Sequence, residues 1–229
     1  MNNQITSFLK KLIQGKYVIK DYNGHKIYLR NNNVDEQVYN YVFNDKYHRP
    51  TMPLNNSSPI ILDLGVNIGL SVIDLKFLFP SAVIYGYELD KDNTNMALKN
   101  TAGLPNVFIH NIGIWYAREK VHISGTDTDA FKIDEAANSE SREVITTTMN
   151  DIVKENKLDH IDFIKMDIEG AEYEVFRHDL QWLDITRQIK VEIHNGQHVF
   201  DLIRERLDQY GFITEKDTHH WSTLIGYKK

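Results

Sequence analysis

The chain has 229 residues, of which 41% are apolar and 25% charged, a composition typical of folded globular proteins rather than disordered ones. Its formal net charge is −6 and its Lys and Arg residues form no stripe, so we expect no nucleic-acid partner. The sequence has no cysteine, which excludes disulfides, thiolate metal sites and cysteine nucleophiles. It also has neither a run of roughly 20 apolar residues nor a secretion signal, so we expect a cytoplasmic protein without a membrane span.

The N-terminal part of the chain predicts a helix, a hairpin, a second helix and a loop. Apolar residues at helical spacing predict helices over residues 4–14 and 34–43. Between these helices, Asn23 and Gly24 separate two alternating segments, which is a strong signal for a β-hairpin. Residues 45–58 are rich in Asn, Pro and Ser and are typical of a loop.

Residues 59–229 predict one α/β domain that follows an N-terminal extension at residues 1–58. The predicted strands cover residues 60–64, 83–87, 107–111, 161–166, 189–193, 212–214 and 223–227. The predicted helices cover residues 69–79, 93–99, 149–155, 171–177 and 197–210. Buried strands joined by helical crossovers indicate a doubly wound, mostly parallel sheet, and residues 125–142 are typical of a mobile insertion.

The first predicted strand of this domain leads into a glycine-rich turn, IILDLGVNIGLSVIDL. Gly65 and Gly69 allow the backbone to approach a ligand closely, and the helix that begins there offers unpaired N–H donors. The dinucleotide-binding fingerprint is not matched, because Asn67 and Leu70 occupy its second and third glycine positions. The turn therefore indicates a nucleotide-type pocket with less room for a pyrophosphate.

A carboxylate ends the second predicted strand, in the stretch AVIYGYELD. Glu88 follows the glycine turn by about 20 residues, which is the spacing expected of a carboxylate that binds two ribose hydroxyls. Asp63 precedes the turn, and its negative charge would repel a phosphate but suit a cation. This charge pattern favours S-adenosylmethionine, with its sulfonium and ammonium groups, over NAD. Asn111, at the end of the third strand, is a further candidate contact to the adenine or ribose.

An apolar strand runs directly into an acidic cluster in the stretch FIKMDIEGAEYEVF. Carboxylates are costly to bury unless a cation or hydrogen-bond donor meets them, so this arrangement indicates a site. Ligands of a doubly wound sheet bind beyond the carboxyl ends of its strands. We therefore expect Asp167 and Glu169 beside the methyl donor, with Glu192 and His194 as their neighbours. Glu172 lies in the following helix, where we expect it to support the first turn.

Four motifs in residues 59–195 resemble those of the FkbM family of S-adenosylmethionine-dependent methyltransferases: DLGVNIG, YGYELD, IDFIKMDIEGAEYEVF and VEIHNG. The most specific part is IKMDIEGAE, followed about 20 residues later by EIH. The resemblance implies a seven-stranded Rossmann-like sheet of the class I methyltransferase fold, a bound S-adenosylmethionine and methyl transfer to a hydroxyl, chiefly of a sugar or polyketide. Residues 1–44 and 125–142 lie outside the resemblance, and in this family such regions differ with the substrate.

Three roles for the acidic cluster follow, because an alcohol acceptor must lose its proton during methyl transfer. His194 is the first candidate base, since a neutral imidazole is available near pH 7 and neighbouring carboxylates raise its basicity. Asp167 is the alternative base, with Glu169 beside the reacting centre. In a third hypothesis, Asp167, Glu192 and His194 hold Mg²⁺ or a similar ion that binds a diol and lowers its pKa. A histidine that merely ends a strand is the remaining alternative.

The sequence therefore predicts a methyltransferase that transfers a methyl group from S-adenosylmethionine to a hydroxyl of a small metabolite, with a sugar or glycan as the first acceptor to consider. The predicted donor-binding residues are Asp63, Gly65, Asn67, Gly69, Glu88 and Asn111. Two alternatives are a nicotinamide-dependent oxidoreductase, which the missing second glycine disfavours, and a non-catalytic domain that retains the nucleotide pocket.

Overall fold

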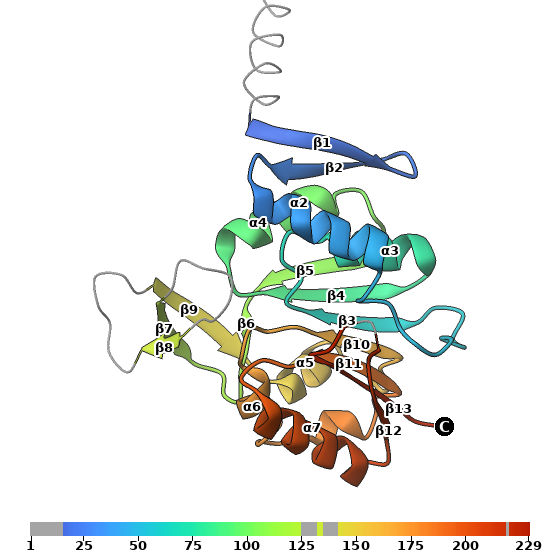
Figure 1. Ribbon diagram of the computed structural model, residues 1–229, viewed down its shortest axis with the longest axis vertical. Coiled ribbons are helices and arrows are strands. Elements are labelled where there is room, and N and C mark those ends of the chain that lie inside the picture. The colour runs from blue at the N-terminus through green and yellow to red at the C-terminus, as the bar shows by residue number, and fades with distance from the viewer. Residues whose placement is uncertain (1–15, 125–131, 135–141, 219) are drawn as a thin grey trace, which may run out of the picture.

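A seven-stranded sheet forms the centre of the molecule and confirms the predicted fold class (Figure 1). The computed structural model describes residues 16–124, 132–134, 142–218 and 220–229, so the helix predicted over residues 4–14 lies outside the described residues. In order across the sheet, the strands are β12 (Ile213–Lys216), β13 (Thr223–Tyr227), β11 (Gln188–Glu192), β10 (Phe163–Met166), β3 (Ile60–Leu64), β4 (Val83–Glu88) and β5 (Val107–Asn111). The five strands from β11 to β5 are parallel, whereas β13 is antiparallel to both of its neighbours, β11 and β12.

Helices cover both faces of this sheet, as a doubly wound fold requires. They are α3 (Leu70–Leu78), α4 (Lys91–Asn100), α5 (Met149–Glu155), α6 (Glu172–Val175) and α7 (Gln197–Gln209). Successive residues of a strand point to opposite faces: Ile61 packs with residues of α3 and α4, whereas Leu62 packs with residues of α5, α6 and α7. The predicted strands and helices of the sheet are confirmed, with boundaries that shift by a few residues. None of the described helices is long and apolar enough to cross a membrane.

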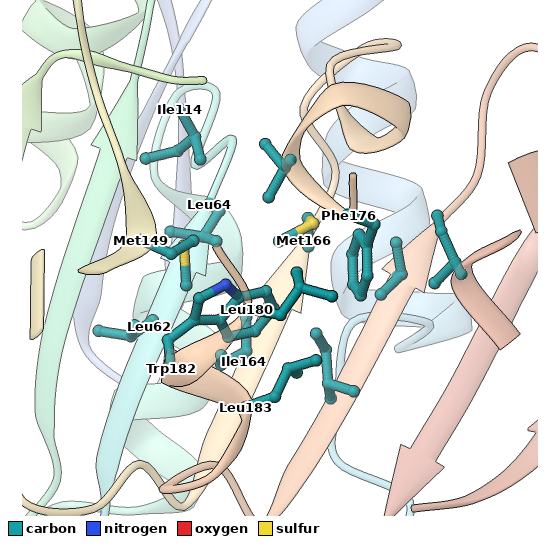
Figure 2. Packing of buried hydrophobic residues seen from close by; sticks show 14 of the residues in the cluster. Leu62, Leu64, Ile114, Met149, Ile164, Met166, Phe176, Leu180, Trp182 and Leu183 are labelled. Atoms are coloured by element: carbon teal, nitrogen blue, oxygen red, sulfur yellow. The ribbon is translucent and has the colours of Figure 1, made fainter. Parts of the chain in front are cut away.

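The larger apolar core lies on the α5, α6 and α7 face (Figure 2). Trp182 is its largest fully buried side chain, and its ring meets Phe176 edge-on at a centroid distance of 5.6 Å. Figure 2 shows Leu62, Ile164 and Met149 close to the same indole. This packing fixes the two central strands β3 and β10, whose carboxyl ends carry the polar residues singled out above.

The direction of winding reverses between β3 and β10. These strands are adjacent and parallel, with Leu64 opposite Met166, although about a hundred residues separate them in the chain. From β3 the chain proceeds to β4 and β5 on one side, and from β10 it proceeds to β11 on the other. Open α/β sheets bind ligands at such a reversal. Gly65 and Asp167, which follow the two strands, are brought together there.

The N-terminal extension packs on the helices of one face. Its elements are β1 (Tyr17–Tyr22), β2 (His25–Arg30), α2 (Asn33–Asn40) and the π-helical turn η1 (Tyr41–Asp45). The two strands form the predicted hairpin, and the helix predicted over residues 34–43 is confirmed as α2 with η1 at its end. Ile27 and Leu29 of β2 join a buried cluster with Ile73 of α3 and Met96 of α4. The extension and the sheet domain therefore share an apolar core.

A second, smaller sheet was not part of the sequence prediction. Its strands, in order, are β6 (Gly113–Ile114), β9 (Arg142–Thr147), β7 (Lys120–Ser124) and β8 (Lys132–Asp134). The expected mobile insertion at residues 125–142 contributes β8 and the first residue of β9, and its other residues lie outside the described ranges. These strands are short and that segment separates them along the chain, so no single stretch carries a clear strand pattern.

Candidate active site

The turn after β3 lies directly against the end of β10. Gly65 has φ +82°, and a Cβ at this position would lie 1.7 Å from the carbonyl oxygen of Asp167, so only glycine fits. The N–H of Gly65 also donates to the carbonyl of Tyr87 in β4 at 2.9 Å. The turn is thereby fixed between the carboxyl ends of three neighbouring strands. Gly69, with φ +84°, ends the turn at the start of α3.

Glu88 ends β4, and two backbone amides hold its carboxylate beside the glycine turn. Its Oε2 accepts a hydrogen bond from the N–H of Asn67 at 2.8 Å, and its Oε1 accepts one from the N–H of Asp90 at 2.8 Å. Burial raises the pKa of Glu88 to about 7, although both hydrogen bonds favour the ionised form. A carboxylate oxygen with one such bond retains a further lone pair for a ligand hydroxyl.

A first pocket extends from this turn to the loop after β5. Its lining includes Gly65, Asn67, Glu88, Ile112, Asp167 and Ile168. Three of the predicted donor-binding residues therefore line one pocket, next to a carboxylate predicted to lie at the reacting centre. The apolar Ile112 and Ile168 give this pocket surfaces suited to a flat ring such as adenine, since ligand pockets combine apolar walls with a few fixed polar groups.

The other three predicted donor residues, Asp63, Gly69 and Asn111, lie outside the lining of the first pocket, and direct contact of Gly69 with the donor stays a prediction. Asp63 is fully buried beneath the turn, where its Oδ2 accepts a hydrogen bond from the hydroxyl of Ser71 at 2.6 Å. Burial raises the pKa of Asp63, and the nearby ammonium of Lys165 opposes that shift. Asn111 donates its side-chain amide to the carbonyl of Glu88 at 3.0 Å and so supports the end of β4. Direct contact of Asp63 and Asn111 with the donor also stays a prediction.

Lys165 is a buried cation that the sequence analysis did not single out. Its Nζ donates to the carbonyl of Gly65 at 2.7 Å, and lies 3.6 Å from Asp63 Oδ1 and 3.4 Å from Asp167 Oδ2. Burial disfavours the charge of Lys165, but the carboxylates of Asp167 and Asp63 raise its pKa above the usual value. One ammonium group therefore joins the turn after β3 to the carboxylate after β10.

His194 follows β11 and faces the acidic cluster. Its Nδ1 lies 3.0 Å from Glu172 Oε1, whereas its Nε2 lies 3.5 Å from Glu169 Oε2 and 4.0 Å from Asp167 Oδ1. Glu172 accepts the N–H of Ile168 at 3.1 Å, as expected of a residue that supports this turn, but it is also fully buried and bonded to the histidine. When Nδ1–H donates to this carboxylate, Nε2 is the ring atom left for a ligand.

The charges of this cluster shift the pKa values of its members. Burial alone would lower the pKa of His194, but the hydrogen bond to Glu172 and the charge of Asp167 raise it to about 9. Burial and the charge of Asp167 raise the pKa of Glu169 to about 8. The rise in the pKa of His194 is in the direction expected from its carboxylate neighbours. The expectation of a neutral ring near pH 7 was wrong, because the increase leaves the ring mostly protonated at that pH.

A second pocket opens on the other side of the cluster. Its polar wall includes Lys165, Asp167, Glu169, Glu192, His194 and His220, and its opposite wall comes from the N-terminal extension. Gly65, Asn67, Asp167 and Glu169 line both pockets, so the two meet at the acidic cluster. Tyr47 of the extension also lines the second pocket, and its ring packs against His220 at a centroid distance of 5.5 Å.

Comparison with known protein families shows which family has a domain like the one that carries this site. The family described as "Methyltransferase FkbM domain" matches residues 63–214, a range that contains both the glycine turn and the acidic cluster. The chain belongs to the FkbM methyltransferase family. It is therefore a methyltransferase that uses S-adenosylmethionine, as the sequence motifs predicted. Family membership sets aside the nicotinamide-dependent alternative.

Known proteins similar to this FkbM methyltransferase include one curated relative, "Methyltransferase sdnD" of Sordaria araneosa. It is 27% identical over 223 residues, which cover 81% of this chain and 85% of the relative. Similar solved structures include a Methanococcus jannaschii fibrillarin pre-rRNA processing protein, with 12% identity and a TM-score of 0.49 over 93% of this chain and 82% of that one. Aeropyrum pernix fibrillarin with bound S-adenosyl-L-methionine has 14% identity and a TM-score of 0.48, over 92% and 81% of the two chains.

The metal-ligand set predicted for this FkbM methyltransferase needs one correction. Among the described residues, the ligand atoms that come within 4.8 Å of one another belong to Asp167, Glu169 and His194. Glu192 is not part of that group; its Oε1 lies 3.8 Å from the Nε2 of His220 instead. Glu192 ends β11 on the side of the site nearer the last strands, so Glu169 takes its place. Metal binding itself stays a prediction.

Three residues of the site were missed or undervalued because their roles depend on tertiary contacts. Lys165 stands in an apolar strand, and the one available signal was its position two residues before Asp167 in a strand that is otherwise buried. Glu172 belongs to a helix of only four residues, α6, so its side chain points back to the strand end. Tyr47 lies in a predicted loop, and no local pattern relates it to a cluster more than a hundred residues away.

Proposed function

We propose that this FkbM methyltransferase transfers the methyl group of S-adenosylmethionine to a hydroxyl of a small molecule, with a sugar as the first class of acceptor to test. The observation that carries this proposal is the meeting of two pockets at Asp167 and Glu169. The first pocket has the features of a nucleoside site, and the second has groups that can bind a hydroxyl and accept its proton. Methyl transfer needs this arrangement, because much of its rate comes from holding two reactants in line.

In the first pocket, Glu88 would bind the ribose hydroxyls, and the backbone at Gly65 would lie against the donor because it carries no Cβ. Asp167 and Glu169 line the pocket and would face the positive groups of the donor, whose charge would favour the ionised form of Glu169. S-adenosylmethionine supplies an activated methyl group on a sulfonium whose positive charge is lost in the reaction. An acidic pocket stabilises such a cation before the reaction takes place.

We propose His194 as the group that accepts the hydroxyl proton. Its Nδ1 donates to the buried carboxylate of Glu172, which fixes the ring and leaves Nε2 facing the second pocket. The ring must first lose its own proton, and the pKa of about 9 makes this the step that limits activity at low pH. A cationic ligand beside the ring favours that loss because like charges repel. Asp167 is the alternative proton acceptor.

The first experiment is a calorimetric titration of the purified protein with S-adenosylhomocysteine, together with the Glu88→Ala variant. We expect binding to the wild type and a loss of at least tenfold in affinity in the variant, because the variant lacks the ribose-binding carboxylate. A panel of methyl glycosides and methyl 2-amino-2-deoxyglycosides is then incubated with S-adenosylmethionine labelled in its methyl group, and the methylated products are identified by mass spectrometry. Methylation confined to amines or carbon atoms would refute the hydroxyl assignment.

The same assay, repeated with EDTA, tests the metal hypothesis. If His194 is the base, activity is retained in EDTA, and His194→Ala lowers turnover by about 10²–10⁴-fold while the affinity for S-adenosylhomocysteine stays within about twofold. If Asp167, Glu169 and His194 hold a divalent ion, EDTA abolishes activity and added Mg²⁺ restores it. Equal losses of turnover and donor affinity in His194→Ala would refute the base assignment.

A further inference from the structure

The outer wall of the second pocket is an apolar stripe on the N-terminal extension. Val34, Val38, Tyr41 and Val42 all line that pocket, at the three- and four-residue spacing that places side chains on one face of a helix. Val34 is 42% exposed and Tyr41 is 54% exposed. An amphipathic helix ordinarily turns its apolar face into the core, but the buried residue of α2 is Asp35. Val42 and Val38 pack in or against the core of the extension. The apolar surface that the stripe exposes to the pocket therefore comes from Val34 and Tyr41.

The extension is held in this orientation at both ends of the stripe. Before it, the guanidinium and N–H of Arg30 donate to the buried carboxylate of Asp35. After it, His48 and Arg49 bind Asp74 of α3, with the His48 Nε2 at 2.9 Å and the Arg49 Nε at 2.7 Å. The first of these charge-assisted contacts fixes α2 against β2, and the second fixes the segment after η1 against α3. The exposed stripe is thus a stable part of the pocket wall, because α2 cannot rotate to bury it without breaking these contacts.

The two walls of the pocket differ in chemistry. The inner wall carries the carboxylates and His194, whereas the outer wall is apolar, and the buried Leu70 of α3 also lines the pocket. A free sugar would satisfy the inner wall but leave the apolar stripe in contact with water. An occupant with hydroxyls at one end and an apolar portion at the other matches both walls. Since the pocket shares Gly65 and Asp167 with the donor site, that occupant is the methyl acceptor.

We infer that the acceptor is amphipathic and that Val34, Val38 and Tyr41 form a subsite for its apolar portion. The N-terminal extension would then determine which acceptors bind. This inference rests on the proposed function, because it concerns the molecule that occupies the second pocket during methyl transfer. It makes no use of the identity of the hydroxyl-bearing part. It predicts that affinity rises with the apolar surface attached to a hydroxyl group, and that the rise depends on the stripe.

The test compares two diols that differ only in the length of their apolar tail, 1,2-octanediol and 1,2-butanediol. Both are titrated by calorimetry into protein saturated with S-adenosylhomocysteine. Each fully buried methylene strengthens binding roughly fourfold, so even partial burial of four additional carbons predicts a preference of at least tenfold for octanediol. Val34→Asn and Tyr41→Ala each reduce this preference to about threefold or less, because they replace parts of the stripe.

Val18→Asn is the matched control. Val18 is also an exposed valine of the extension, at 41% against 42% for Val34, but it lies on β1 and does not line the pocket. The control keeps the full preference. Equal affinities of the two diols for the wild type would overturn the inference, as would an unchanged preference in both pocket variants or an equal loss in Val18→Asn. A change of oligomeric state in Val34→Asn would also overturn it, because the stripe would then serve a second copy of the chain.

Binding of S-adenosylhomocysteine separates this inference from the proposed function. All three variants should bind it with the affinity of the wild type, which also reports that each is folded. Wild-type protein that binds S-adenosylhomocysteine but does not distinguish the diols refutes the apolar subsite alone. Wild-type protein that does not bind S-adenosylhomocysteine refutes the donor site, and the proposed function with it.

Discussion

The donor side and the acceptor side of this site are built from different materials. The first pocket, proposed for the donor, depends on backbone geometry at the turn after β3, where Gly65 carries no Cβ and the amides of Asn67 and Asp90 hold Glu88. The acceptor pocket is formed by side chains from segments far apart in the chain, among them Tyr47, Glu192 and His194. Backbone turns permit few substitutions, whereas side-chain walls can be changed one residue at a time. The donor side is therefore the constrained half and the acceptor side the adjustable one.

The largest expected effect comes from Gly65→Ala, which breaks the donor half. The new Cβ would lie 1.7 Å from the Asp167 carbonyl oxygen, so the turn must move. Since a misplacement of about 1 Å at a reacting site can cost about 100-fold, we expect a loss of donor affinity of about 100-fold or more, measured by calorimetry. Gly103→Ala is the control: Gly103 has φ +84° but no neighbour within 4 Å, so it loses about 1–2 kcal/mol of stability and keeps donor binding. Similar donor affinities in the two variants would contradict this account.

Lys165→Met should destabilise the buried ion pairs between the turn after β3 and the end of β10. Without the ammonium, the buried carboxylate of Asp63 has no cation beside it, and breaking a buried pair costs about 3–5 kcal/mol in the free energy of unfolding, measured with urea. The double variant Asp63→Asn, Lys165→Met should recover much of this loss. Lys76→Met is the control, because this buried lysine donates to the carbonyl of Ala82 and forms no ion pair with a carboxylate of the described residues. An equal loss for both lysines would show that the ion pair is not the cause.

Glu172→Gln tests the hydrogen bond between Glu172 and His194, which lies where the two pockets meet. Removing the negative charge beside Nδ1 should lower the pKa of His194 from about 9, so the rise of activity with pH shifts to lower pH. Turnover at high pH should fall by about 10–100-fold, because the ring becomes a weaker base and loses its fixed tautomer. Steady-state rates between pH 6 and 10, in EDTA, measure both effects. Glu174→Gln, which changes the other glutamate of α6, should leave the profile unchanged, and an equal shift in this control would refute the assignment.

The same raised pKa makes stability depend on pH in a defined direction. The folded protein binds the His194 proton more tightly than the unfolded chain does, so this proton stabilises the fold fully below the unfolded pKa of about 6.5. The contribution is lost as the pH rises through about 9. The difference in unfolding free energy between the wild type and Glu172→Gln should therefore be larger at pH 6 than at pH 10. A difference that grows with pH would contradict the sign of the shift.

The smallest expected effect is that of Asp74→Asn, which loosens the acceptor half alone. Asp74 accepts hydrogen bonds from Tyr22, His48 and Arg49, all in the extension, so the variant should lose about 1–3 kcal/mol of stability. The KM for the acceptor found in the glycoside panel should rise several-fold, while the affinity for S-adenosylhomocysteine stays within about twofold. Asp151→Asn, which removes one exposed ion pair with Arg118, is the control and should change neither quantity. A larger change in donor affinity than in acceptor KM would contradict the view that Asp74 supports the acceptor pocket and not the donor pocket.

The same division explains what the sequence could predict. Gly65 and Glu88 were predicted from spacing, because a glycine turn between a buried strand and a helix, and a carboxylate at the end of the next strand, form a local pattern. Glu172 and Lys165 obtain their roles from contacts across the sheet, which no local period encodes. The acceptor wall at Val34 was visible only as a helix; its direction depends on the anchors at Asp35 and Asp74.

The small sheet was missed for another reason, the shortness of its strands. Its strand β6 has two residues, and its strand β8 has three, so neither is long enough to show an alternating pattern. The pairing of β6 with β9 joins residues more than thirty positions apart, at Gly113 and Thr146. The core strands were predicted because burial on both faces makes each one a continuous apolar run, and these short, partly polar strands carry no such signal.

The residues common to both pockets have a kinetic consequence. Gly65, Asn67, Asp167 and Glu169 touch whatever occupies either side, so occupancy of one pocket alters the wall of the other. By thermodynamic linkage, the factor by which the donor changes the affinity for the acceptor equals the factor by which the acceptor changes the affinity for the donor. Under the proposed assignment, the demethylated donor would keep its contacts with Glu88 but would carry no sulfonium charge for the carboxylates. Release of the two products is therefore coupled, and product inhibition by one should depend on the concentration of the other.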